Sequence, residues 1–205
     1  QHVAGGWRVI AAGVPGDTAV QGCLRWERDV VPAHPRLAII AFGLNDGALS
    51  RTPSDAWREG WWLASRWHLG RLYGRWGRHL LSSQPAAEGQ ERTRPRVFGQ
   101  ALGCMVRGAR RLGSRVCLLT PTPVLRETIG ERQWQAYARY QAMVLDVARR
   151  CRVIGIDLWQ PDGHAPLAEA LVAGDGLHLT VEGHRWLADL LWRQLVDKGL
   201  LCTTG

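Results

Sequence analysis

Apolar residues fall along the chain in four short runs of strand length. Leu37 to Phe42 (LAIIAF) is the clearest of these runs, because no polar residue interrupts it. A continuous apolar run of this length is typical of a strand that is covered on both faces. The pattern predicts strands at Trp7–Gly13, Leu37–Phe42, Arg115–Leu119 and Val153–Leu158.

The segments between these runs carry apolar residues at helical spacing. Gly113 is suited to end one of the helices, and Thr180 is suited to cap the start of the last one. The pattern predicts helices at Thr18–Val30, Val97–Leu112, Arg132–Arg150 and from Thr180 through Leu195. Strands that alternate with helices indicate an α/β domain with a mainly parallel sheet and helices on both faces.

One stretch, at about residues 50–96, departs from this alternation. Ser54–Leu80 is helix-like and contains five of the eleven tryptophans, with arginines between them. Ser82–Arg96 is polar and contains two prolines, so we expect an exposed loop there. We interpret the stretch as a Trp/Arg-rich helical insertion in a single domain spanning residues 1–205. It could pack its tryptophans onto the domain, form a lid or substrate wall, or contact a membrane.

The net charge of +8 comes almost entirely from arginine, since Lys198 is the single lysine. The arginines occur throughout the sequence, and basic charge alone is a weak indication of nucleic-acid binding, so we expect no nucleic-acid partner. No run approaches the ~20 apolar residues that cross a bilayer. The first residues also lack the pattern of a signal peptide. Localisation and oligomeric state cannot be read from the sequence.

The cysteines are odd in number, and none of them forms a Cys-x-x-Cys pair. They are Cys23, Cys104, Cys117, Cys151 and Cys202. We expect buried free thiols rather than a disulfide framework. Metal-ligand spacing is absent, so we expect no metal and no other cofactor.

Asp175 and His178 are three residues apart, immediately before the last predicted helix. In a tight turn this spacing allows the carboxylate to accept a hydrogen bond from Nδ1 of the imidazole, which leaves Nε2 free to act as a general base. The alternative is an aspartate that hydrogen-bonds near a helix N-terminus, with an exposed histidine beside it. We interpret His184, inside the predicted helix, as a surface residue.

Two further phrases follow predicted strands, where open parallel sheets bind their ligands. The side-chain amide of Asn45 could donate to a developing oxyanion, although Asn45-Asp46-Gly47 is also ordinary turn chemistry. Gly16 has no side chain, so its backbone N–H could approach a ligand closely. Its surroundings, Gly13–Thr18, could equally be only a turn from a strand to a helix.

In this order the three phrases resemble the sequence blocks of the GDSL/SGNH hydrolase family. Gly13–Thr18 resembles its glycine block, Gly43–Asp46 its Gly-x-Asn-Asp block, and Asp175–Thr180 its Asp-x-x-His block. The resemblance spans nearly the whole chain. It implies a flavodoxin-like three-layer α/β/α sandwich and the hydrolysis of a small-molecule ester through an acyl-enzyme.

The resemblance also implies a role for each candidate residue. His178 is the general base and Asp175 orients it. The backbone N–H of Gly16 and the side-chain amide of Asn45 are oxyanion donors. The nucleophile is not among these residues.

In that family the nucleophile is the serine of a Gly-Asp-Ser phrase that follows the first strand. This chain has no such phrase, and no serine precedes Gly13. We therefore expect an N-terminally incomplete domain, whose first, central strand and nucleophilic serine lie upstream of residue 1. The alternatives are a catalytically inactive binding module for acyl or carbohydrate ligands, or another nucleophile. Thr18 imitates that serine in Gly16-Asp17-Thr18, but the triplet is ordinary for the glycine block.

Overall fold

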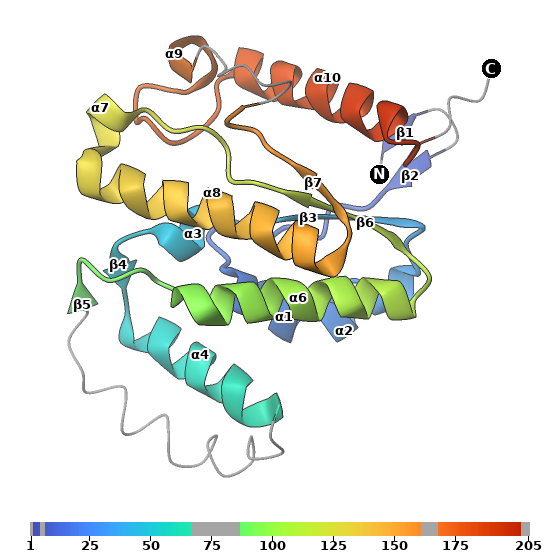
Figure 1. The fold of residues 1–205 in the computed structure, drawn as a ribbon, viewed down its shortest axis with the longest axis horizontal. Helices are drawn as coiled ribbons and strands as arrows, with labels where there is room; N and C mark the ends of the chain where they lie inside the picture. Colours follow the sequence, from blue (N-terminus) through green and yellow to red (C-terminus); the bar gives the residue numbers. More distant parts are fainter. Residues whose placement is uncertain (1, 5–6, 67–86, 161–167, 202–205) are drawn as a thin grey trace.

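A three-stranded parallel sheet lies at the centre of the computed structural model (Figure 1). Its strands are β3 (Leu37–Ala41), β6 (Arg115–Leu119) and β7 (Ile154–Ile156), in the order β3-β6-β7. Three of the four predicted strands and their parallel pairing are thereby confirmed. The structure describes residues 2–4, 7–66, 87–160 and 168–201.

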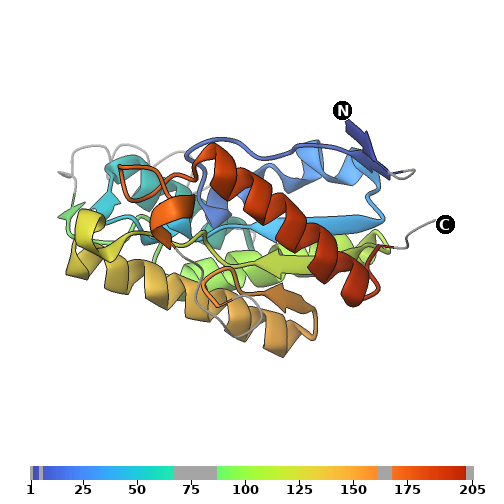
Figure 2. The ribbon, with the colours of Figure 1, turned by 90° about the horizontal axis from the view of Figure 1, so that it is seen from above.

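Long helices cover both faces of the sheet, as the alternation of strands and helices predicts. They are α6 (Pro95–Arg111), α8 (Glu131–Cys151) and α10 (Val181–Asp197). Figures 1 and 2 show α10 on one side of the sheet and α6 with α8 on the other. The expected α/β/α sandwich is confirmed.

Alternate residues of β6 face opposite sides of the sheet and enter two separate apolar clusters. Val116 and Leu118 pack with residues of α6 and α8. Cys117 and Leu119 pack with residues of α10. Because both faces are buried from Val116 to Leu119, this part of the strand is apolar throughout, as a continuous apolar run predicts.

Local signals set the ends of two of these helices. Gly113 adopts a φ of +74°, and the N–H of Ser114 donates to the carbonyl of Ala109 at 3.0 Å, so α6 stops at the expected glycine. At the start of α10, the Thr180 hydroxyl accepts a hydrogen bond from the N–H of Gly183 at 3.0 Å. Both sequence predictions are confirmed.

The prediction that Trp7–Gly13 is a strand of the parallel sheet is wrong. Only Trp7–Val9 forms a strand, β2, and it pairs antiparallel with β1 (His2–Ala4). In the described part of the chain, no strand pairs with the outer edge of β3. The expected position of Trp7–Gly13 lies one strand beyond this edge, where it would have no neighbour in the sheet. The backbone groups of β2 form their hydrogen bonds with β1 instead.

The predicted helix Thr18–Val30 is interrupted. It consists of α1 (Ala19–Leu24) and α2 (Trp26–Asp29), and the short 3₁₀ helix η1 (Val31–Ala33) follows. The break falls at Arg25, whose guanidinium group binds Asp17 and the carbonyl of Ala12, both at 2.6 Å.

The stretch interpreted from the sequence as an insertion begins with β4 (Ser50–Arg51) and α4 (Pro53–Arg66), and β5 (Ala87–Glu88) pairs antiparallel with β4. The predicted helix is confirmed as far as Arg66, and the rest of Ser54–Leu80 lies outside the described residues. Trp62 is only 3% exposed and belongs to the main apolar cluster. For this part of the insertion, packing onto the domain is the reading that the structure supports.

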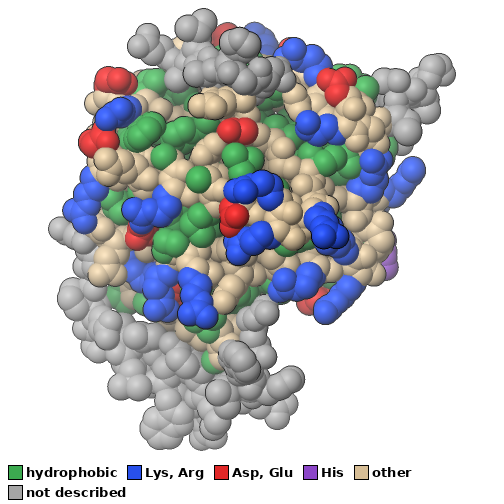
Figure 3. Space-filling view, in the orientation of Figure 1, with side chains coloured by type: hydrophobic (Ala, Val, Ile, Leu, Met, Phe, Trp, Pro, Cys, Tyr) green, Lys and Arg blue, Asp and Glu red, His purple; other side chains and the backbone are tan. Residues whose placement is uncertain are grey.

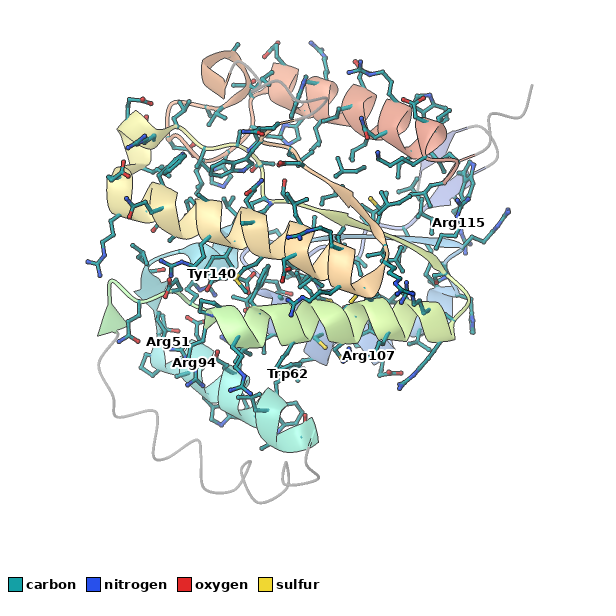
Figure 4. All side chains as sticks on the ribbon, viewed as in Figure 1. Arg51, Trp62, Arg94, Arg107, Arg115 and Tyr140 are labelled. Carbon is teal, nitrogen blue, oxygen red and sulfur yellow. The ribbon has the colours of Figure 1, made fainter. Side chains whose placement is uncertain are left out.

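Ionic contacts fix α4 to the rest of the domain. The carboxylate of Glu59 is buried, and it pairs with Arg51 and with Arg94. Figure 4 shows Arg51 and Arg94 together at the junction of α4 with the start of α6. The stretch predicted as an exposed loop thus contributes Arg94 to the pairing of a buried carboxylate.

Four of the cysteines lie in described segments, and none of these four is disulfide-bonded. Burial raises the pKa of the Cys117 thiol to about 12, so this group stays protonated.

No helix of the described ranges has the length and apolar character needed to cross a bilayer. Lys and Arg side chains are spread over the whole face seen in Figure 3.

Candidate active site

The sequence-predicted site residues lie at the carboxyl end of the parallel sheet. α3 (Leu44–Gly47) follows β3, and α7 (Arg126–Ile129) follows β6. The loop that holds His178 follows α9 (Ala168–Leu171), and the N–H of Leu125, just before α7, donates to its Gly176 carbonyl at 2.9 Å. Figures 1 and 2 show α3, α7 and α9 at one end of the molecule.

Asp175 and His178 form the contact that their spacing predicts. Nδ1 of His178 lies 2.6 Å from Oδ2 of Asp175. The other carboxylate oxygen accepts hydrogen bonds from the N–H groups of Leu177 at 2.9 Å and of His178 at 3.0 Å. No hydrogen bond in the described part of the chain occupies Nε2 of His178, so this nitrogen is free to accept a proton.

These contacts keep the Asp175 carboxylate ionised. The backbone hydrogen bond from His178, followed by the contact with its side chain, lowers the pKa of Asp175 to about 2. The carboxylate is therefore charged at neutral pH and favours a proton on Nδ1 of the facing imidazole.

The loop takes this shape because of local backbone geometry. The N–H of Ala173 donates to the carbonyl of His178 at 2.7 Å, which closes the loop. Gly176 adopts a φ of +73°, and an added Cβ would lie 2.6 Å from the Cβ of Thr128. Only glycine fits this position, and its close approach seats the loop against α7.

Gly16 lies in a turn closed by a hydrogen bond from the N–H of Asp17 to the carbonyl of Val14 at 3.2 Å. Its φ of +80° fits the third position of a type II turn, after Pro15. An added Cβ on Gly16 would meet nothing within 4 Å, and its N–H has no partner among the described residues. The predicted turn is confirmed, and its N–H is open to a ligand.

Asn45 lies half-buried in α3, directly after β3. The chain leaves the strand at Gly43, where φ is +129° and an added Cβ would lie 2.6 Å from Cγ of Pro121. Only glycine allows this approach. It turns the chain so that Asn45 starts a short helix rather than continuing the strand.

Helix α8 holds this turn from the other side. The Gln133 side chain donates to the carbonyl of Gly47 at 2.8 Å and accepts from the N–H of Leu49 at 3.0 Å. The turn that carries Asn45 is therefore fixed at both of its ends.

A buried carboxylate joins the two turns that carry the candidate donors. Asp46 has no exposed surface, and both of its oxygens accept from the N–H of Ala19, at 2.9 and 3.2 Å. Ala19 begins α1 directly after the Gly16 turn. Burial raises the pKa of Asp46 to about 6, although hydrogen bonds from Thr93, Ala19 and Gly43 act in the opposite direction.

The stability of the protein should therefore depend on pH through Asp46. Between pH ~4 and ~6 the folded state binds more protons at this carboxyl than the unfolded state does, so its contribution to stability falls as the pH rises. Relative to Asp46→Asn, the unfolding free energy of the wild type should fall by about 2 kcal/mol from pH 4 to pH 7. Urea unfolding of both proteins across this range measures the difference; a difference that is constant or rises with pH contradicts the assignment.

Thr18 is not available as a nucleophile. It is only 3% exposed, and its hydroxyl donates to Oε1 of Gln21 at 3.1 Å. Its N–H donates to the same oxygen, as in a helix capping box. This agrees with the prediction that Thr18 belongs to the turn and not to the chemistry.

Residues 2–186 match the GDSL-like lipase/acylhydrolase family. The chain belongs to this family. The match covers all three predicted blocks and supports a hydrolase role for the chain. In the described segments no group of three or more His, Cys, Asp or Glu side chains is placed to hold a metal ion.

Solved members of the family share the fold at low identity. A lipase/acylhydrolase from Enterococcus faecalis is 20% identical, with a TM-score of 0.63 over 93% of this chain and 75% of that chain. The acetyl xylan esterase AlAXEase is 18% identical, with a TM-score of 0.59 over 89% of this chain and 78% of that chain. A curated relative, the uncharacterized lipoprotein YqeF of Bacillus subtilis (strain 168), is 24% identical over 86% of this chain and 69% of its own length.

Two residues that organise the site have no role of their own in the sequence-based prediction. Asp46 belongs to the Gly43–Asp46 phrase, and its position next to Asn45 is the sequence feature that could have indicated its role. Arg92 lies in the stretch predicted as an exposed loop, yet its side chain is 19% exposed and binds the carbonyl of Gly16 at 3.1 Å. No local pattern indicates that contact.

Proposed function

We propose that this protein is a serine ester hydrolase that acts through an acyl-enzyme. The observation that carries the proposal is the Asp175–His178 pair, whose Nδ1 is held by a carboxylate and whose Nε2 is free. The turns that carry Gly16 and Asn45 lie at the same end of the sheet. This is the end at which open α/β sheets bind their substrates, which supports the proposed roles of base and oxyanion donors.

Each residue then has one step in the reaction. Nε2 of His178 takes the proton from the serine hydroxyl as its oxygen attacks the ester carbonyl, and later gives that proton to the leaving alcohol. Asp175 stabilises the imidazolium that forms in between. The Gly16 N–H, the Asn45 amide and the N–H of the serine itself bind the oxyanion. Water, activated by the same histidine, then releases the acid from the serine.

We further propose that the serine comes from residues ahead of Gln1, on a strand that pairs with the free edge of β3. Two observations support this part. The outer edge of β3 has no strand partner in the described part of the chain. Ile39 in the middle of that strand is 44% exposed, whereas its neighbours Ala38 and Ile40 are buried. A strand parallel to β3 at this edge would end beside the Asn45 turn.

The test uses the protein expressed from its complete gene. It should hydrolyse p-nitrophenyl acetate with saturable kinetics, and a fluorophosphonate should label one serine and stop turnover. Peptide mapping should place the label ahead of Gln1. A series of acyl chain lengths and an acetylated xylo-oligosaccharide would then define the substrate class.

Other outcomes separate the alternatives. A label on a serine within residues 1–205 would leave the esterase in place and overturn the upstream nucleophile. Neither turnover nor labelling, together with binding of acyl or sugar ligands, would favour the non-catalytic binding module.

A further inference from the structure

We propose that Arg92 is a positioning residue that orients the oxyanion donor Gly16 and couples helix α4 of the insertion to it. The inference rests on the proposed function, since it names a device that serves the same site. It is carried by the hydrogen bonds of a single side chain, which joins two separate segments of the chain, the Gly16 turn and α4.

The guanidinium group of Arg92 is the centre of the contact. Its Nη1 donates to the carbonyl of Gly16 at 3.1 Å. Its Nη2 and Nε donate to the two carboxylate oxygens of Asp55 in α4, at 3.1 and 3.3 Å. One planar group therefore holds the Gly16 turn and α4 in a fixed relation, which an ammonium group could not do with the same geometry.

The acid that holds Arg92 is itself fixed. Asp55 is buried, and its Oδ2 also accepts from the N–H of Thr52 at 3.0 Å and from the Thr52 hydroxyl at 2.7 Å. Although burial raises the pKa of Asp55, the hydrogen bonds from Arg92 and Thr52 lower it overall. The carboxylate is thus ionised at neutral pH and keeps the guanidinium in place.

The backbone of Arg92 contacts the turn that carries the second proposed donor, Asn45. Its N–H donates to the carbonyl of Ala48, one residue after α3, at 3.0 Å. The next residue, Thr93, donates its N–H to the carbonyl of Asp46 at 3.1 Å. Residues 92 and 93 therefore run along the Asn45 turn while the Arg92 side chain holds the Gly16 turn.

This arrangement sets the direction of the Gly16 backbone. The Gly16 turn is exposed, and apart from Arg92 only the hydrogen bond from the N–H of Asp17 to Val14 restrains its backbone among the described residues, so the freedom of glycine would let its peptide groups tilt. Arg92 fixes the Gly16 carbonyl on one side of the turn, so that the N–H on the preceding peptide keeps one direction. A donor of fixed direction stabilises a developing charge without reorganisation.

The test compares two arginines of the same loop. Arg92→Met keeps the apolar stem and removes the guanidinium. Arg94→Met also removes an ionic contact to α4, a single bond to Glu59 from a more exposed side chain, and this contact does not touch Gly16. With p-nitrophenyl esters, Arg92→Met should lower kcat by about tenfold with little change in KM, because the Gly16 N–H that Arg92 orients binds the oxyanion only in the transition state. The loss should be equal for acetate and butyrate esters. Arg94→Met should stay within about twofold of wild type.

Hydrogen exchange gives a readout that does not depend on activity. Amides of residues 13–18 should exchange faster in Arg92→Met and at the wild-type rate in Arg94→Met. Equal loss of kcat in the two variants, or a loss that depends on acyl length, would overturn the inference in favour of a general loosening of α4. An absence of esterase activity in the wild-type protein would contradict the proposed function. Unchanged hydrogen exchange of residues 13–18 in Arg92→Met would contradict the proposal that Arg92 orients Gly16.

Discussion

Replacing His178 with alanine should lower kcat/KM for ester hydrolysis by about a thousandfold or more. Without the imidazole nothing accepts the serine proton during attack, and nothing returns a proton to the leaving alcohol. KM should change little, because the base acts on the nucleophile rather than on the bound ester. Initial rates with p-nitrophenyl acetate measure the effect on the protein expressed from its complete gene.

His184 provides the matched control. It lies six residues farther on, in α10, and its Nδ1 is 2.8 Å from the backbone carbonyl of Thr180. It is exposed and lacks a carboxylate partner among the described residues, so His184→Ala should retain wild-type rates. If the two alanine variants hydrolyse the ester equally fast, His178 is not the base, and the pair with Asp175 is only a loop contact.

Much of the fold is predictable because its determinants are local. β6 is apolar from Val116 to Leu119 because both of its faces are buried, and the helices carry an apolar stripe toward the sheet. The strand expected at Trp7–Gly13 fails for a different reason. This segment can join the parallel sheet only if another strand lies beside it, and a pattern of seven residues does not indicate whether that strand is present.

In the candidate site, too, local contacts are predictable from the sequence and distant ones are not. The Asp175–His178 contact is predictable because the two residues are three apart and one loop closes around them. The relation between Gly16 and Asn45 is not local. It depends on Asp46 reaching Ala19 across 27 residues and on Arg92 reaching Gly16 across 76 residues. The blocks of the family indicate which residues take part, whereas only the packed structure indicates what holds them in place.

Replacing Asn45 with alanine should lower kcat by about a hundred- to a thousandfold while leaving KM nearly unchanged. The amide donates to an oxygen that becomes negative only in the tetrahedral intermediate, so its loss weakens binding of the transition state and not of the ester. Asn45 has a geometry suited to this role, because Gly43 and Gln133 fix its turn and no hydrogen bond of the described residues engages its side chain. Steady-state kinetics with p-nitrophenyl acetate separate the two parameters.

A boronic acid that forms a tetrahedral adduct with serine gives the independent measurement. If Asn45 is an oxyanion donor, Asn45→Ala should weaken inhibition by phenylboronic acid by a factor similar to its loss in kcat/KM. Gln141 is a half-buried amide that instead binds Asp157, at 2.9 Å, so Gln141→Ala controls for the loss of an amide as such. Full boronate affinity in Asn45→Ala with a reduced kcat would assign Asn45 to the structure of the turn, and the oxyanion would then depend on Gly16 and the serine N–H alone.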